Sequence, residues 1–361
     1  MLEEYLTNPM KPVETILAGG LPLPNEAHIS FWNTLAKESS TPVFELLGAH
    51  LPQLRIPILK DISQSEPYAD VVRRGRAFDD VHFEQASVYE EPDKITFTMQ
   101  EHDAGALPVI ETPNRTDFIH LYQALAAKCE PVDIPDEMHA AFIAGLPNQG
   151  RLRLNKIKWQ EGGLDQVPFE SWGKAMQRLL AADKTHFYDK IVLLQKSPYG
   201  SVPASQVLDG LSGAQWLERS SVLRLEHEMT HYATNRMLGS FRLNIHDELL
   251  ADFMGISAAL GSFSSALFFA AMGVEDDICP EGCRYRHYTQ ELDEEALAQV
   301  LALSRLAADN LERLSTQLPR EYPPACILLA LAAFDIPAMA KPACIEQILA
   351  TAEKYFNTLY K

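Results

Sequence analysis

The pattern of hydrophobic and polar positions changes character near residue 185 of the 361-residue chain. Before this point, short periodic stretches are separated by many prolines. Apolar spacing predicts helices at 26–37, 116–128 and 169–182, and strand-like alternation covers 94–99. The run 187–195 is the strongest strand candidate, because β-branched and aromatic residues cluster there.

From Ser212 onward the periodicity is almost entirely helical. Ser212 and Gln215 have the capping-box form, and Gly239 can end the helix that they begin. Further helices are predicted at 245–260, 262–272, 290–317, 324–335 and 345–359. We therefore expect an α+β protein with a mixed α/β region over residues 1–185 and a mostly helical region over residues 186–361.

One segment, Phe253–Val274, carries no charged residue over 22 positions and is long enough to cross a bilayer. Gly261 followed by Ser262 is typical of one helix ending and another beginning. We therefore expect two buried helices here and no membrane span.

Composition and charge narrow the possible partners. The chain is 47% hydrophobic and has a net charge of −18, which supports a folded core and disfavours binding to nucleic acid or to an anionic membrane. Its 5 cysteines are odd in number and scattered, unlike a disulfide framework. Acidic residues follow Met1 where a signal peptide would carry Lys or Arg, so we expect a reducing cytoplasm.

The helix predicted after Ser212 contains the sequence His227-Glu-Met-Thr-His231. Histidines four residues apart lie one turn apart on the same side of a helix, so both imidazoles can reach one zinc ion. Glu228 is rotated by about 100° from His227 and can hold a water beside that ion. This spacing makes His227 and His231 candidate zinc ligands and Glu228 a candidate general base.

The same helix has an apolar stripe, formed by Val222, Leu225, Met229 and Ala233. We expect this stripe to face the core, with both histidines on the opposite, polar side. The alternative to metal binding is that the two histidines form an incidental pair on a solvated helix face.

A catalytic zinc ion usually has three protein ligands, and the next predicted helix offers Glu248 as the third. Glu248 and Asp252 are four residues apart among apolar neighbours, so we expect both carboxylates to point inward, where a divalent cation would neutralise them. The alternative is an exposed pair of acidic residues. His246 could compete for the metal, but its place two residues before Glu248 favours a capping or loop role.

These motifs resemble the gluzincin branch of the zincin metallopeptidases, over about residues 190–260. The resemblance implies zinc ligation by His227, His231 and Glu248, and a general base at Glu228. It also implies that Asp252 orients one ligand imidazole. A zincin-like fold with a small mixed sheet is then expected, in which the strand at 187–195 is the edge that receives an extended substrate.

A loop further along contains Cys279, Cys283 and the cluster Arg284-Tyr-Arg-His-Tyr288. Tyr288 or His287 could stabilise an oxyanion, and Arg286 could bind a substrate carboxylate. Cys279, Cys283 and His287 could instead hold a second, structural zinc ion. The remaining alternative is a surface loop paired with Glu291 or Asp293.

The sequence thus predicts a zinc-dependent metallohydrolase that acts on a peptide or another amide-containing substrate. The alternative is a zincin-fold protein that binds zinc but acts as a small-molecule tailoring enzyme or as a non-catalytic binding module.

Overall fold

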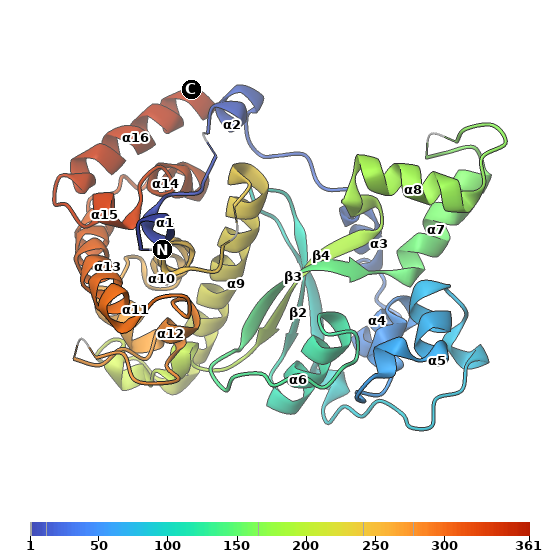
Figure 1. Ribbon diagram of the computed structural model, residues 1–361. Coiled ribbons are helices and arrows are strands. Elements are labelled where there is room, and N and C mark those ends of the chain that lie inside the picture. The colour runs from blue at the N-terminus through green and yellow to red at the C-terminus, as the bar shows by residue number, and fades with distance from the viewer. Residues whose placement is uncertain (1, 12, 165, 241, 277) are drawn as a thin grey trace. The chain divides into compact units, whose positions relative to one another are not determined.

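The computed structural model describes residues 2–11, 13–164, 166–240, 242–276 and 278–361 (Figure 1). Contacts divide the chain into two compact units: Pro24–Gln195, and a second unit in which Met1–Leu23 joins Lys196–Lys361. This grouping differs from the division expected at residues 185/186. The strand expected to open the C-terminal region pairs inside the sheet of the first unit, and the beginning of the chain packs with the C-terminal helices.

The unit Pro24–Gln195 is built around a four-stranded mixed sheet with the strand order β1-β2-β4-β3. The strand pairs β1/β2 and β3/β4 are antiparallel, whereas β2 and β4 are parallel. The bounds are Thr96–Gln100 for β1, Leu107–Thr112 for β2, Ala140–Pro147 for β3 and Tyr188–Gln195 for β4. An α+β fold with a small mixed sheet is therefore confirmed.

Strand β4 lies between β2 and β3, so the expectation that it forms an edge of the sheet was wrong. The edges are β1 and β3. All residues from Ile191 to Gln195 are buried, and this continuous burial is typical of an interior strand that is covered on both faces. The apolar residues that predicted the strand form a continuous run, and such a run favours an interior position over an edge.

Helices cover this sheet and complete its core. The predicted helix at 116–128 is α6, which begins after Asn114, whose side chain accepts a hydrogen bond from the backbone N–H of Asp117. Strands β2 and β3 and helices α4 and α7 were not predicted. The bounds are α3 Ile29–Leu35, α4 Val43–His50, α5 Glu66–Tyr68, α6 Arg115–Leu125, α7 Gln149–Gln160 and α8 Trp172–Ala182.

A buried polar cluster ties helices to β4 in this unit. Asp189 is fully buried and accepts hydrogen bonds from Trp32 Nε1 at 2.7 Å, Asn148 Nδ2 at 2.8 Å and Arg151 Nε at 2.7 Å. Burial raises the pKa of Asp189, and the charge of Arg151 opposes this rise. Because Arg151 is itself buried, each charge depends on the other.

The second unit is mostly helical. Helix α9 begins with the expected capping box of Ser212 and Gln215 and ends at Gly239, which has a left-handed backbone. The bounds are α1 Leu2–Leu6, α2 Glu14–Gly19, α9 Gly213–Leu238, α10 Ile245–Leu260, α11 Ser265–Ala271, α12 Arg284–His287, α13 Glu294–Ser315, α14 Pro324–Leu331, α15 Ile336–Met339 and α16 Cys344–Leu359. Figure 1 shows α11 and α13–α16 as an orange to red arc within this unit.

The uncharged segment forms two helices, as predicted. Gly261 ends α10 with a left-handed backbone, and α11 is capped by Ser264 rather than by Ser262. Among the described residues no single helix is long and apolar enough to cross a membrane. Only α10 and α11 taken together reach that length and apolarity, and they are bent by 117°.

The expected faces of α9 are confirmed only in part, since Met229 and Ala233 of the predicted stripe are buried. Val222 of the same stripe is 48% exposed, and two polar residues of the helix, Ser220 and Arg224, are buried. The segment before α9 explains this: the N–H of Tyr199 donates to Ser220 Oγ at 3.0 Å, and Arg224 donates to the carbonyl oxygen of Pro198. Polar side chains of α9 are therefore buried against hydrogen-bonding partners.

Replacing Asp189 by Asn should destabilise the protein by about 3–5 kcal/mol, because Arg151 would keep its charge without a buried counter-ion. Asp79→Ala is the matched control. It removes an ion pair with Arg55 in which the two side chains are 80% and 41% exposed, and such pairs contribute about 0–1 kcal/mol. Urea unfolding measures both changes, and equal losses for the two variants would contradict this account of Asp189.

Candidate metal centre

Helices α9 and α10 approach each other closely at Gly255. A Cβ atom at this position would lie 2.6 Å from the carbonyl oxygen of Leu223 and 3.4 Å from the backbone nitrogen of His227. Only a residue without a side chain allows this approach. The contact brings the middle of α10 against the turn of α9 that carries His227.

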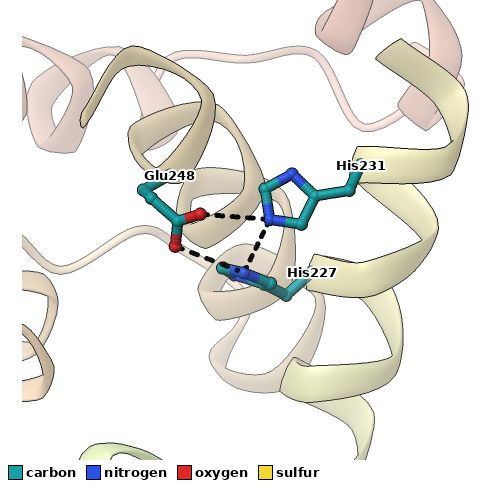
Figure 2. A group of neighbouring side chains, drawn as sticks. All are labelled: His227, His231 and Glu248. Atoms are coloured by element: carbon teal, nitrogen blue, oxygen red, sulfur yellow. Dashed lines mark hydrogen bonds and ion pairs between the residues drawn. The ribbon is translucent and has the colours of Figure 1, made fainter. Parts of the chain in front are cut away.

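His227 and His231 of α9 and Glu248 of α10 point toward one another (Figure 2). His227 Nε2 and His231 Nε2 are 3.0 Å apart, Glu248 Oε1 is 3.3 Å from His231 Nε2, and Glu248 Oε2 is 3.5 Å from His227 Nε2. Each of the three residues is buried, with an exposed fraction of 1–4%. Burial excludes the alternatives of a solvated histidine pair and of an exposed acidic pair.

These spacings fit a tetrahedral zinc ion. Donor atoms that each lie 2.0–2.1 Å from a tetrahedral ion are about 3.3 Å from one another. The two imidazole nitrogens are 3.0 Å apart, and the two oxygens of Glu248 lie 3.3 Å from His231 Nε2 and 3.5 Å from His227 Nε2, close to that value. The described residues therefore contain a buried group that could bind a metal, made of the three ligands expected from the sequence.

Asp252 occupies the place expected for the residue that orients an imidazole. It is fully buried, and its Oδ1 lies 2.7 Å from Nδ1 of His227. A proton on Nδ1 of His227, donated to this carboxylate, leaves Nε2 with a free lone pair that faces His231 and Glu248. Tyr199 also donates its hydroxyl to Asp252 Oδ1.

Mutual stabilisation of charges dominates the electrostatics of the cluster. Burial opposes ionisation of Glu248, but hydrogen bonding to His231 and the charges of His231, His227 and Arg284 lower the pKa of its carboxyl group. Burial would also lower the pKa of His231, yet the hydrogen bond and charge of Glu248 raise it. The carboxylate form of Glu248, which a metal requires, is therefore favoured.

Glu228, the expected general base, follows His227 on α9 and is 7% exposed. Its charge is among those that raise the pKa of the buried His231, which indicates that its carboxylate lies near the cluster. The structure assigns Glu228 no hydrogen bond among the described residues, so its chemical role stays a prediction.

Arg284 is a component of the centre that the sequence did not assign. Its Nη2 donates to Glu248 Oε2 at 2.8 Å, and its Nη1 donates to Tyr199 Oη at 3.1 Å. We expected a divalent cation to neutralise the buried carboxylates, but Arg284 already supplies one positive charge to Glu248. The only sequence clue is the cationic and phenolic cluster at 284–288, in which the predicted binding residue is Arg286.

The other residues of that cluster lie in different surroundings. Arg286 forms two hydrogen bonds with Glu294, at 2.7 and 3.0 Å. Pairing with an acidic residue was the alternative expected for a surface loop, but the expected partners were Glu291 or Asp293. His287 is exposed. Tyr288 lies closer to the centre: burial raises the pKa of its phenol, and the charge of Glu248 and a hydrogen bond to it act in the same direction. The catalytic and binding roles given to these residues stay predictions.

The suggested second zinc site is not assembled among the described residues. The sulfur atoms of Cys279 and Cys283 are 2.9 Å apart, but His287 forms no metal-binding group with them. His246 is also outside the centre. It lies in α10 rather than in a loop, and its Nε2 is 2.8 Å from the carbonyl oxygen of Phe334.

The beginning of the chain contacts the elements around the centre. The hydroxyl of Tyr5 donates to the carbonyl oxygen of Tyr288 at 2.9 Å and accepts from the N–H of Ile245 at 3.1 Å. Tyr5, Tyr288, His287 and Arg242 are among the residues that line a cavity of about 230 Å³. No sequence motif indicated this arrangement, because a single tyrosine in a short helix carries no recognisable pattern.

The chain belongs to a family of unknown function, DUF7005, which matches residues 1–343. No curated protein and no solved structure matches it.

Gly255→Ala should destabilise the protein by about 1–3 kcal/mol, because the new methyl group would collide with the backbone of α9. Gly213→Ala is the matched control: it lies at the start of α9 with no atom near the new Cβ, so stability should stay level or rise by about 0.4–1 kcal/mol. Denaturant unfolding compares them. Equal stability of the two variants would show that α9 and α10 are not in close contact at Gly255.

Proposed function

We propose that this protein is a zinc-dependent metallohydrolase of the zincin type that cleaves a peptide or another amide-containing substrate. The observation that carries the proposal is the convergence of two imidazole nitrogens and one carboxylate from α9 and α10, at separations suited to tetrahedral zinc. Nitrogen donors beside a carboxylate favour zinc over magnesium or calcium, which prefer oxygen ligands only.

The order of the residues also supports a likeness to the gluzincins. His227, Glu228 and His231 lie on one helix, Glu248 lies on the next, and Asp252 contacts His227 through the nitrogen that faces away from the other donors. In this proposal Asp252 holds His227 in the correct tautomer. The donor set fits zinc without any displacement of a ligand residue.

When bound, zinc lowers the pKa of a water ligand toward about 7 and polarises a carbonyl group. In the proposed reaction Glu228 accepts a proton from the attacking water and returns it to the leaving amine. Tyr288, whose phenol lies near Glu248, is the candidate donor to the oxyanion that develops. These residues would place a base and a hydrogen-bond donor beside the ligands.

One observation favours a second candidate function. Arg284 neutralises Glu248 without any metal ion, so the polar cluster can also be stable as a structural or ligand-binding centre. The protein would then be a zinc-binding tailoring enzyme or a non-catalytic binding module. Zinc content and peptide cleavage, measured on the same samples, distinguish the two functions.

His231→Ala should abolish stoichiometric zinc binding, because two of the three protein ligands cannot hold the ion tightly. Zinc content after dialysis, measured by atomic absorption, tests this. His287→Ala is the matched control, since His287 is exposed and outside the donor group, and it should keep the zinc of the wild type. Full zinc content in the His231 variant would mean that the ligands are wrongly assigned.

Glu228→Gln should keep zinc but lower peptide cleavage by about 10²–10⁴-fold, the usual contribution of a general base. The assay is a digest of a broad peptide library with and without chelator. Glu226→Gln, which also removes a carboxylate from α9 but not from the donor group, should retain activity. If zinc-loaded wild type cleaves no peptide, the second candidate function is favoured instead.

A further inference from the structure

Arg284 reaches the candidate metal centre from an element outside the ligand helices. It lies on α12, 36 residues beyond Glu248, and its side chain is 16% exposed. The 2.8 Å contact between Nη2 and Glu248 Oε2 is therefore a largely buried, charge-assisted hydrogen bond.

The guanidinium group has three partners at once. Besides Glu248, its Nη1 donates to Tyr199 Oη at 3.1 Å, and its Nε donates to Tyr288 Oη at 3.4 Å. A planar fork of donors can serve three oxygens in fixed directions, whereas a lysine ammonium group acts as a flexible point charge. Arg284 is thus held in one orientation by its own contacts.

Through Tyr199 the same guanidinium is connected to a ligand histidine. Tyr199 donates its hydroxyl to Asp252 Oδ1, and this oxygen also lies 2.7 Å from His227 Nδ1. Arg284 therefore contacts Glu248 directly and is linked to His227 by two hydrogen-bonded residues.

The two oxygens of Glu248 have different neighbours. Oε1 is 3.3 Å from His231 Nε2, and Oε2 is 3.5 Å from His227 Nε2, so both oxygens face the donor nitrogens. Only Oε2 also accepts the hydrogen bond from Arg284, at the shorter distance of 2.8 Å. A carboxylate can bind a cation through one oxygen or through both. An oxygen that accepts a charge-assisted hydrogen bond is a poorer metal ligand, because its electron density is shared with the cationic donor.

We infer that Arg284 is a positioning residue that restricts Glu248 to one-oxygen ligation and so keeps a coordination position open for water or substrate. This inference rests on the metal site of the proposed function. Catalytic zinc needs an open coordination position, and a carboxylate that binds through both oxygens would help to fill it. Arg284 would therefore influence the geometry of the centre as well as neutralise Glu248.

Cobalt(II) is a suitable probe, because its visible absorption is intense in four-coordinate sites and weak in six-coordinate sites. The full-length wild type, Arg284→Gln and Arg286→Gln are stripped of metal and titrated with Co²⁺, and X-ray absorption then counts the oxygen ligands. Arg286 is the matched control, since it lies on the same helix but pairs with Glu294, which is 77% exposed. Circular dichroism checks that each variant is folded.

The wild type and Arg286→Gln should show the same intense absorption and the same oxygen count. Arg284→Gln should gain one oxygen ligand and absorb more weakly, because Oε2 of Glu248 is released to the metal. A folded Arg284→Gln protein whose spectrum equals that of the wild type would overturn the role of Arg284 and leave the proposed function intact. Absence of Co²⁺ and Zn²⁺ binding in the wild type would overturn both.

The wild type also provides a test that does not depend on folding of a variant. X-ray absorption of its zinc form should show Glu248 bound through one oxygen. The scattering of a carboxylate carbon close to the metal is the signature of two-oxygen ligation, and this signature in the wild type would contradict the inference even if Arg284→Gln fails to fold.

Discussion

The burial of two carboxylates, Glu248 and Asp252, is the constraint on which the helical unit depends. An isolated buried carboxylate is too costly to remain charged, so partners must come from neighbouring elements. Glu248 receives two imidazoles of α9 and the guanidinium of Arg284, and Asp252 receives His227 and the Tyr199 hydroxyl. This demand explains why His227 and His231 of α9 are buried and why Arg284 of α12 contacts Glu248 of α10.

Local features of this centre could be predicted from the sequence. The spacing of His227 and His231 gives their relation on one helix, and helix caps such as Ser212 and Gly239 define where α9 begins and ends. The placement of Glu248 followed from a carboxylate among apolar neighbours. Each of these inferences needed only residues within a few turns of one another.

Other features of the fold and the centre could not be predicted, because they depend on contacts between segments that are distant in the sequence. Hydrophobicity alone did not predict the burial of Arg224 and Ser220 on α9, because their hydrogen-bonding partners precede the helix. The sequence does not show which of Arg284 and Arg286 contacts Glu248, because both lie in one short helix and differ only in their neighbours in the fold. Likewise, the interior position of β4 follows from its pairing with β2 and β3, and no local pattern shows which strands will pair.

The place of Tyr5 has a consequence for how the chain is made on the ribosome. Tyr5 bonds to Tyr288 and Ile245, so a segment that is translated before Pro24–Gln195 packs in a unit whose other residues are translated after it. At about 5–20 residues per second, translation of the intervening Pro24–Gln195 alone takes roughly ten to thirty seconds. During that interval Ile245 and Tyr288, the partners of Tyr5, have not yet been made, whereas Pro24–Gln195 can begin to fold as soon as it emerges.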